Sequence, residues 1–182
     1  LAQEVPEGTP LPRNLTPAEA ALLARNPIVS TKMVTPPPVG PIHCAAEYEP
    51  MEAIVMSYEG SSSWKDIQCQ MAAEITTTGN ADVRMVVDTA AEQTTAFNAM
   101  AAKGANMARV TFEVITTDSI WLRDYGPRYI YQGGVRAIVD HTYNRPRPKD
   151  DALNAAFGPT QGHRVYELDL IHGGGNYHLS AL

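Results

Sequence analysis

The stretch Ser119–Ile130, SIWLRDYGPRYI, places an indole, an Arg–Asp pair and a Gly–Pro turn between apolar, strand-like segments. Asp124 lies just beyond the apolar run 110–115, and α/β proteins place functional groups on loops that a rigid scaffold holds. A carboxylate there can accept two parallel N–H bonds from a planar guanidinium. Trp121 offers a face for the alkyl stem or the cation of such a ligand. The stretch therefore predicts half of a guanidinium-binding site.

The same residues also admit a purely structural interpretation. Arg123 and Asp124 could pair with other groups of the scaffold, and Trp121 could belong to the core. Spacing alone does not separate the two interpretations.

The composition narrows the class of protein. The chain has 182 residues, 44% of them hydrophobic and 19% charged, and a net charge of -6. This is ordinary globular material, enough for one domain or for part of a larger one. Clustered Lys and Arg, which a nucleic-acid partner requires, are absent, and no run approaches the ~20 apolar residues of a membrane helix. We expect neither nucleic acid nor membrane as a partner.

The sequence starts at Leu1 without a methionine, as it would after removal of an export signal or through an engineered boundary. We expect a secreted or periplasmic protein. Cys44 and Cys69 permit one disulfide in an oxidising compartment, and two free thiols are the alternative.

The first 44 residues predict one helix and an extended arm. Thr16 is a suitable N-cap, Pro17 suits the first helical position, and Glu19 completes a capping box. Prolines then follow in close succession. The segment 1–44 is thus expected to be a helix and a Pro-rich arm that wraps a larger body at 45–182, with a disordered leader as the alternative.

From residue 51 strands and helices alternate. One helix is predicted at 63–75, where Ile67, Met71 and Ile75 share a face, and another from the capping box of Thr89 and Glu92 to a stop at Gly104. The predicted strands are 53–57, 83–87, 110–115, 129–131, 135–139 and 165–170.

This order predicts an α/β protein with mixed sheets, in which a βαβ beginning turns antiparallel through a hairpin at Gly133-Gly134. A dinucleotide-binding sheet fits less well. No glycine-rich phosphate loop follows the first strand, and the glycines 173–175 come too late in the chain.

Four segments in the same order resemble the family of agmatine deiminases and bacterial, Porphyromonas-type peptidylarginine deiminases. SIWLRDYGPRYI resembles the family's Trp-x-Arg-Asp-x-Gly-Pro segment. The other three are AAEYEPMEAIVMSY at 45–58, YNRPRPKDD at 143–151 and GGGNYH at 173–178. The resemblance runs from about residue 45 to the end.

The resemblance implies a pentein fold, a five-bladed α/β propeller of ββαβ units around a central active site. It implies hydrolysis of a guanidinium to a ureido group with loss of ammonia, through a cysteine thiouronium intermediate and without metal or cofactor. Asp124 matches the family's guanidinium-binding and catalytic aspartate, and Trp121 matches the aromatic residue beside it.

Arg145 and Arg147 fall in the segment that resembles the peptidylarginine branch. Two arginines that alternate with prolines on a stiff, extended loop can form a fork for a carboxylate. Such a fork suits a peptide that ends in arginine, or free arginine, but not agmatine, which lacks the carboxylate. A solvated basic loop is the alternative interpretation.

The family's His-x-Asp motif and its late nucleophilic cysteine have no counterpart in this sequence. None of the five histidines has an acidic residue two positions later, and Cys44 and Cys69 come too early in the chain. We therefore expect a partner, a C-terminal fragment of the same enzyme that carries both groups after cleavage near Leu182. An agmatine deiminase relative and a non-catalytic guanidinium-binding protein are the competing interpretations.

Overall fold

The computed structural model describes residues 9–30, 32–46 and 48–178, which fall into two compact units. One unit combines Pro12–Glu49 with the chain from Arg123 onward, and the other combines Pro50–Leu122 with residues 9–11. The arm is therefore not separate, because most of it packs in the same unit as the C-terminal part of the chain. The boundary between units falls inside the short helix α4, Leu122–Tyr125.

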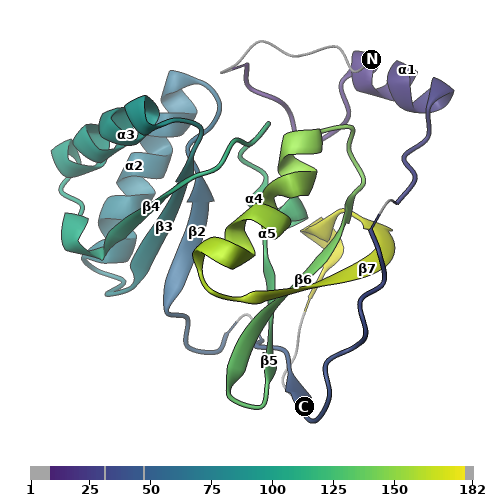
Figure 1. Ribbon diagram of the computed structural model, residues 1–182. Helices are drawn as coiled ribbons and strands as arrows, with labels where there is room; N and C mark the ends of the chain where they lie inside the picture. Colours follow the sequence, from purple (N-terminus) through teal and green to yellow (C-terminus); the bar gives the residue numbers. More distant parts are fainter. Residues whose placement is uncertain (1–8, 31, 47, 179–182) are drawn as a thin grey trace. The chain divides into compact units, whose positions relative to one another are not determined.

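The unit built on Pro50–Leu122 contains a parallel three-stranded sheet in the order β2-β3-β4, with β2 at Ala53–Ser57, β3 at Asp82–Val87 and β4 at Val110–Val114 (Figure 1). Parallel neighbours need crossover connections, and helices α2 (Ser62–Thr76) and α3 (Ala90–Ala102) supply them. These strands and helices confirm the predicted βαβ beginning.

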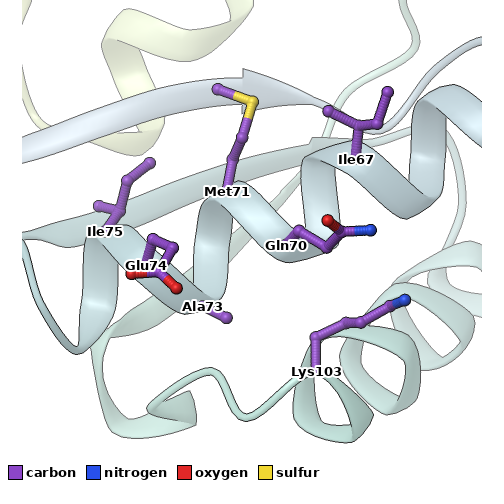
Figure 2. A pocket seen from close by; sticks show the side chains of 7 residues that line it. All are labelled: Ile67, Gln70, Met71, Ala73, Glu74, Ile75 and Lys103. Atoms are coloured by element: carbon purple, nitrogen blue, oxygen red, sulfur yellow. The ribbon is translucent and has the colours of Figure 1, made fainter.

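The core of this unit lies where α2 and α3 pack on the sheet. Most of its buried members are aliphatic or sulfur-containing residues, among them Met56, Cys69, Ala72, Val83, Met85 and Met100. The face of α2 that the sequence predicts to be buried is not the face that packs on the sheet, where Cys69 and Ala72 are buried instead. Ile67 and Met71 are about half exposed, and with Ile75 and Lys103 they line a groove of about 440 Å³ (Figure 2).

The unit that contains Arg123 onward has a mixed four-stranded sheet in the order β1-β5-β6-β7. Its strands are β1 (Ile42–His43), β5 (Arg128–Gln132), β6 (Val135–Tyr143) and β7 (Arg164–His172). The pairs β1–β5 and β5–β6 are antiparallel, whereas β6–β7 is parallel. The predicted hairpin is confirmed, and Gly133 adopts φ +61° at its turn.

The parallel pair β6–β7 is connected by a helix that the sequence did not predict, α5 at Pro148–Thr160. Leu153 and Phe157 are buried on it, one turn apart. The short 3-10 helices Met107–Arg109 and Gly174–Asn176 complete the described elements.

The arm begins with the predicted helix, α1 at Pro17–Arg25, and its capping box is complete. The backbone N–H of Glu19 donates to Thr16 Oγ1, while Glu19 Oε2 accepts from the Thr16 backbone N–H at 2.7 Å. Further along, the Thr35 N–H donates to the Glu167 carbonyl of β7, and β1 adds itself to the edge strand β5. The arm is thereby held on both edges of its sheet. In the described part of the chain, no helix has the length and apolar character needed to cross a membrane.

Candidate functional site

Asp124 is a buried carboxylate on α4, only 4% exposed. Its Oδ2 lies 3.4 Å from Nε of Arg13, a residue 111 positions earlier in the sequence. The Arg13 side chain itself is 54% exposed. The residue predicted to bind a substrate guanidinium therefore already contacts a guanidinium that the arm supplies.

The glycines 173–175 explain how the backbone comes so close to this ion pair. A Cβ at Gly175 would stand 2.9 Å from Asp124 Oδ1 and would collide with the Arg13 guanidinium. A Cβ at Gly174 would collide with the Arg128 guanidinium. Glycine is needed where a backbone approaches other groups this closely. Two of the four recognised sequence segments thus meet at Asp124.

Arg128 forms another wall of the same region. Its guanidinium lies 4.5 Å from the centre of the Tyr177 ring, a cation–π contact. Its Nη2 also donates to the Asp124 carbonyl at 3.4 Å. Burial lowers the pKa of Arg128, and the nearby charge of Arg123 lowers it further.

Arg145 and Arg147 lie in the same unit but differ in exposure and in partners. The Arg145 Nε donates to the carbonyl of Arg13, and its Nη1 donates to Asn144. Arg147 is 2% exposed, and its Nε donates to Glu19 Oε1 at 2.8 Å. A solvated basic loop is therefore the wrong description of Arg147.

The predicted extended loop is also wrong, because residues 144–146 form a bend and Arg147 caps helix α5. The Arg147 N–H donates to the Arg145 carbonyl at 2.8 Å, which closes a tight turn. The two side chains still share a neighbourhood, since the charges of both act on Tyr143, as does that of Asp124. Whether the two arginines bind substrate stays a prediction.

Glu19 and Arg147 each stabilise the charged form of the other. Burial on its own raises the pKa of Glu19, but the hydrogen bond and charge of Arg147 and the bonds from Thr16 outweigh it, so that the pKa is lowered. Burial likewise opposes the charge of Arg147, and Glu19 reverses the effect and raises its pKa. Both groups are therefore held in their charged forms.

Two further buried titratable groups, Tyr143 and His141, stand on β6. Burial raises the pKa of Tyr143 well above its ordinary value. Burial, assisted by the positive charge of Arg128, lowers the pKa of His141 to about 4. The His141 ring packs edge-on against His172, with ring centres 5.8 Å apart. His141 is therefore neutral near pH 7.

Trp121 belongs to the other unit and is half-buried there. Its ring packs edge-on against Trp64, with ring centres 5.9 Å apart, and its indole N–H donates to the Leu11 carbonyl at 2.8 Å. The indole therefore has structural partners, and its role beside a substrate cation stays a prediction.

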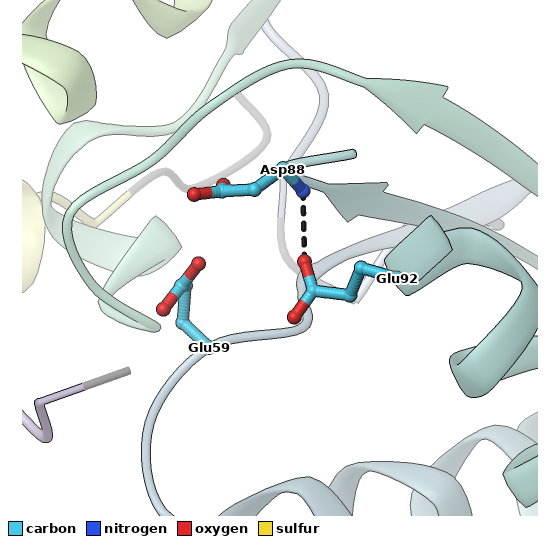
Figure 3. Close-up of side chains that lie close together, drawn as sticks. All are labelled: Glu59, Asp88 and Glu92. Carbon is cyan, nitrogen blue, oxygen red and sulfur yellow. Dashed lines mark hydrogen bonds between the residues drawn. The ribbon is translucent and has the colours of Figure 1, made fainter. Parts of the chain in front are cut away.

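The second unit also holds an acidic cluster of Glu59, Asp88 and Glu92, whose carboxylate oxygens lie within 4.8 Å of one another (Figure 3). Glu92 accepts from the Asp88 backbone N–H and from Lys65 Nζ, the latter at 2.6 Å. Burial and the charge of Asp88 raise the pKa of Glu59 to about 8. Oxygen ligands of this kind suit a hard cation, but protonation of Glu59 and the Lys65 ammonium already offset most of the negative charge.

The cysteines stay apart in the described chain. Both Cys44 and Cys69 are free thiols, so the disulfide that the sequence permits is not formed. Cys69 is buried on α2, and burial raises the pKa of its thiol. A thiol with a raised pKa is a poor nucleophile.

Sequence reasoning missed the residues that contact the predicted site from the arm. The contact of Arg13 with Asp124 spans 111 positions and that of Glu19 with Arg147 spans 128. Glu19 was recognisable as a capping residue, but no pattern in the sequence marks it as the partner of Arg147. No pattern marks Arg13 at all.

Known structures share this fold. A candidate agmatine deiminase matches with a TM-score of 0.67 at 19% identity, over 76% of this chain and 42% of that one. A substrate-bound variant of the C. jejuni agmatine deiminase matches with a TM-score of 0.58 at 19% identity, over 74% and 41%. A candidate arginine deiminase from Porphyromonas gingivalis matches with a TM-score of 0.59 at 13% identity, over 74% and 43%.

The chain spans about two fifths of the length of these structures, and it has their mixed α/β fold. The model of the Porphyromonas-type peptidyl-arginine deiminases matches residues 43–180, which is most of the chain. The chain therefore belongs to the Porphyromonas-type peptidyl-arginine deiminase family.

Proposed function

We propose that this chain carries the guanidinium-binding part of a deiminase that converts the guanidinium of arginine to the ureido group of citrulline. The observation that carries the proposal is the buried carboxylate of Asp124, which faces a guanidinium in the structure. Membership of the family supplies the reaction class.

In the proposed reaction, Asp124 holds the cation while a thiolate attacks the central guanidino carbon. Ammonia then leaves with a proton from a histidine, and water hydrolyses the thiouronium to release the ureido product and the thiol. Buried, fixed charges are effective here because they stabilise the reacting cation without reorganisation. We propose that a His-x-Asp motif and a nucleophilic cysteine beyond this chain supply the base and the thiolate.

Arg145 and Arg147 are proposed to select the substrate. A guanidinium fork favours a carboxylate, so that a peptide ending in arginine, or free arginine, is preferred over agmatine. Arg147 already pairs with a carboxylate, that of Glu19, which supports its suitability for this role. Agmatine deimination is the less favoured second candidate.

Two wider proposals concern the whole enzyme. We propose that the complete protein closes into a five-bladed propeller, and that a separate, non-covalently held polypeptide carries the missing groups. Intact-mass measurement of the purified, denatured protein should show a second polypeptide with a His-x-Asp motif and a late cysteine. A single folded species of this chain alone would contradict the proposal. Export to the periplasm or beyond is likewise proposed, and cell fractionation tests it.

The function itself is tested by ureido-product assays on the full-length protein with three substrates: a peptide ending in arginine, a peptide with internal arginine, and agmatine. We expect the first to be the best substrate. Asp124→Asn should lower kcat/KM by about 10²- to 10³-fold, because the cation loses its fixed counter-charge. Asp169→Asn, which removes an exposed carboxylate from β7, is the matched control. Equal activity of the two variants would refute the proposal.

A further inference from the structure

The segment 12–19 contacts Asp124, Arg145 and Arg147, three of the four residues that the sequence predicts to bind substrate. In the first unit, Arg13 lies against Asp124, and its carbonyl accepts from Arg145 Nε at 3.2 Å. Arg147 Nη2 donates to the Pro12 carbonyl at 2.7 Å.

The chemistry of these contacts matches that of the proposed substrate. A peptide that ends in arginine offers a guanidinium and a carboxylate. The arm offers a guanidinium to Asp124 through Arg13, and a carboxylate to Arg147 through Glu19. Arg13 therefore contacts the residue proposed to bind the substrate guanidinium, and Glu19 contacts a residue proposed to bind the substrate carboxylate.

The two contacts differ in strength. The pair of Glu19 and Arg147 is buried, with side-chain exposures of 10% and 1%, and two Arg147 nitrogens reach the carboxylate. The pair of Arg13 and Asp124 has a single 3.4 Å contact, and the Arg13 side chain is half exposed. Exposed ion pairs of the second kind contribute little to stability, because water screens them. Glu19 therefore anchors the arm, while Arg13 can leave Asp124 at small cost.

We propose that the segment 12–19 is an intramolecular pseudosubstrate, in which Arg13 occupies Asp124, the carboxylate proposed to bind the substrate guanidinium, until a substrate displaces it. This inference rests on the proposed function, because it assigns Asp124 the role of substrate ligand. The arm then acts as a competitive inhibitor that raises the apparent KM and leaves kcat unchanged, since substrate binding depends on the fraction of molecules in which Asp124 is free.

The first test compares Arg13→Gln with Arg25→Gln in the full-length protein. Glutamine keeps a polar side chain and leaves the backbone carbonyl to which Arg145 donates, but it carries no positive charge. Arg25 is exposed in the last turn of α1 and is the matched control. We expect Arg13→Gln to lower KM by about two- to sixfold at constant kcat, and Arg25→Gln to change neither. An unchanged or raised KM in Arg13→Gln would overturn the proposal.

A second variant, Glu19→Gln, tests the contact with Arg147 separately from the contact of Arg13 with Asp124. Glu19→Gln preserves the capping box, because glutamine serves at this position as well as glutamate does, but it removes the charge from the partner of Arg147. We expect KM to fall for a peptide ending in arginine and to stay constant for agmatine, which has no carboxylate. Equal changes for both substrates would contradict the mimicry.

A binding measurement distinguishes failure of this inference from failure of the proposed function. Calorimetry with guanidinium chloride against sodium chloride reports occupancy of Asp124 without turnover. Tighter guanidinium binding by Arg13→Gln in a protein that releases no ureido product would support the pseudosubstrate and refute the deiminase. Turnover by the wild type, with unchanged guanidinium binding in Arg13→Gln, would refute the pseudosubstrate alone.

Discussion

Lys32 Nζ lies 2.6 Å from Asp140 Oδ2, and both side chains are nearly excluded from water. Lys32→Met removes the cation and leaves the Asp140 carboxylate buried beside a neutral donor, Asn154 Nδ2 at 3.0 Å. Uncompensated buried charges cost about 3–5 kcal/mol. We expect a loss of this size in the free energy of unfolding, measured by urea titration of the full-length protein.

The exposed pair of Lys103 and Asp66 provides the control for that measurement. Its atoms are also 2.6 Å apart, but both side chains are more than a third exposed. Lys103→Met should therefore lower the free energy of unfolding far less than Lys32→Met does. If the two lysine substitutions lowered the free energy of unfolding equally, burial of the pair of Lys32 and Asp140 would not explain the loss.

Glu59 should make the protein less stable as the pH rises. Its pKa is raised from 4.5 to about 8 in the folded state, so the folded protein keeps a proton that the unfolded chain has released. Stability from this group is present below pH 4.5 and is lost as the pH rises toward 8. Glu59→Gln should raise the free energy of unfolding at pH 8 by roughly 1–3 kcal/mol and flatten its pH dependence. Glu74→Gln, an exposed carboxylate on α2, should leave the profile unchanged.

His141 should have the opposite effect in the acid range. Because its folded pKa is lowered to about 4, the unfolded chain binds a proton between pH 6.5 and 4 that the folded protein excludes. Stability therefore falls as the pH drops through this window. In an NMR titration the His141 ring signals should stay constant from neutral pH down to about pH 5. Titration of His141 at pH 6.5 would contradict its burial.

Gly175→Ala should impair guanidinium binding, because the new Cβ occupies the space beside Asp124 Oδ1 in which the guanidinium of Arg13 now lies. We expect KM for arginine peptides to rise by about tenfold or more, since small displacements at a reacting centre are costly. Gly134→Ala is the control, because a Cβ at that position meets nothing within 4 Å. A variant with unchanged KM would show that substrate binds elsewhere.

Most helices and strands could be predicted from the sequence, and helix α5 was missed for a physical reason. Helix α5 lacks a side-chain cap, since its N-cap is Arg147, and it carries Gly158 and Pro159 near its end. Those residues are typical of loops. The glycine is needed because a Cβ there would collide with Val165. Packing against β7 thus overrides the local signal.

The candidate site was predictable only where the chemistry is local. Asp124 and the glycines 173–175 carry recognisable motifs, and the structure brings them together. Arg13 and Glu19 reach the site from the arm, across more than a hundred residues of sequence. No periodicity or spacing can encode such contacts, because tertiary packing alone creates them.

The Glu19 carboxylate makes two kinds of contact at once, since its Oε2 closes the capping box of α1 while both of its oxygens accept from Arg147. A helix of nine residues is only marginally stable by itself. The contacts of the Glu19 carboxylate therefore help to stabilise α1. Fraying of the first helical turn and release of the arm are then a single event. Warming the protein should therefore separate the Glu19 carboxylate from Thr16 and from Arg147 together.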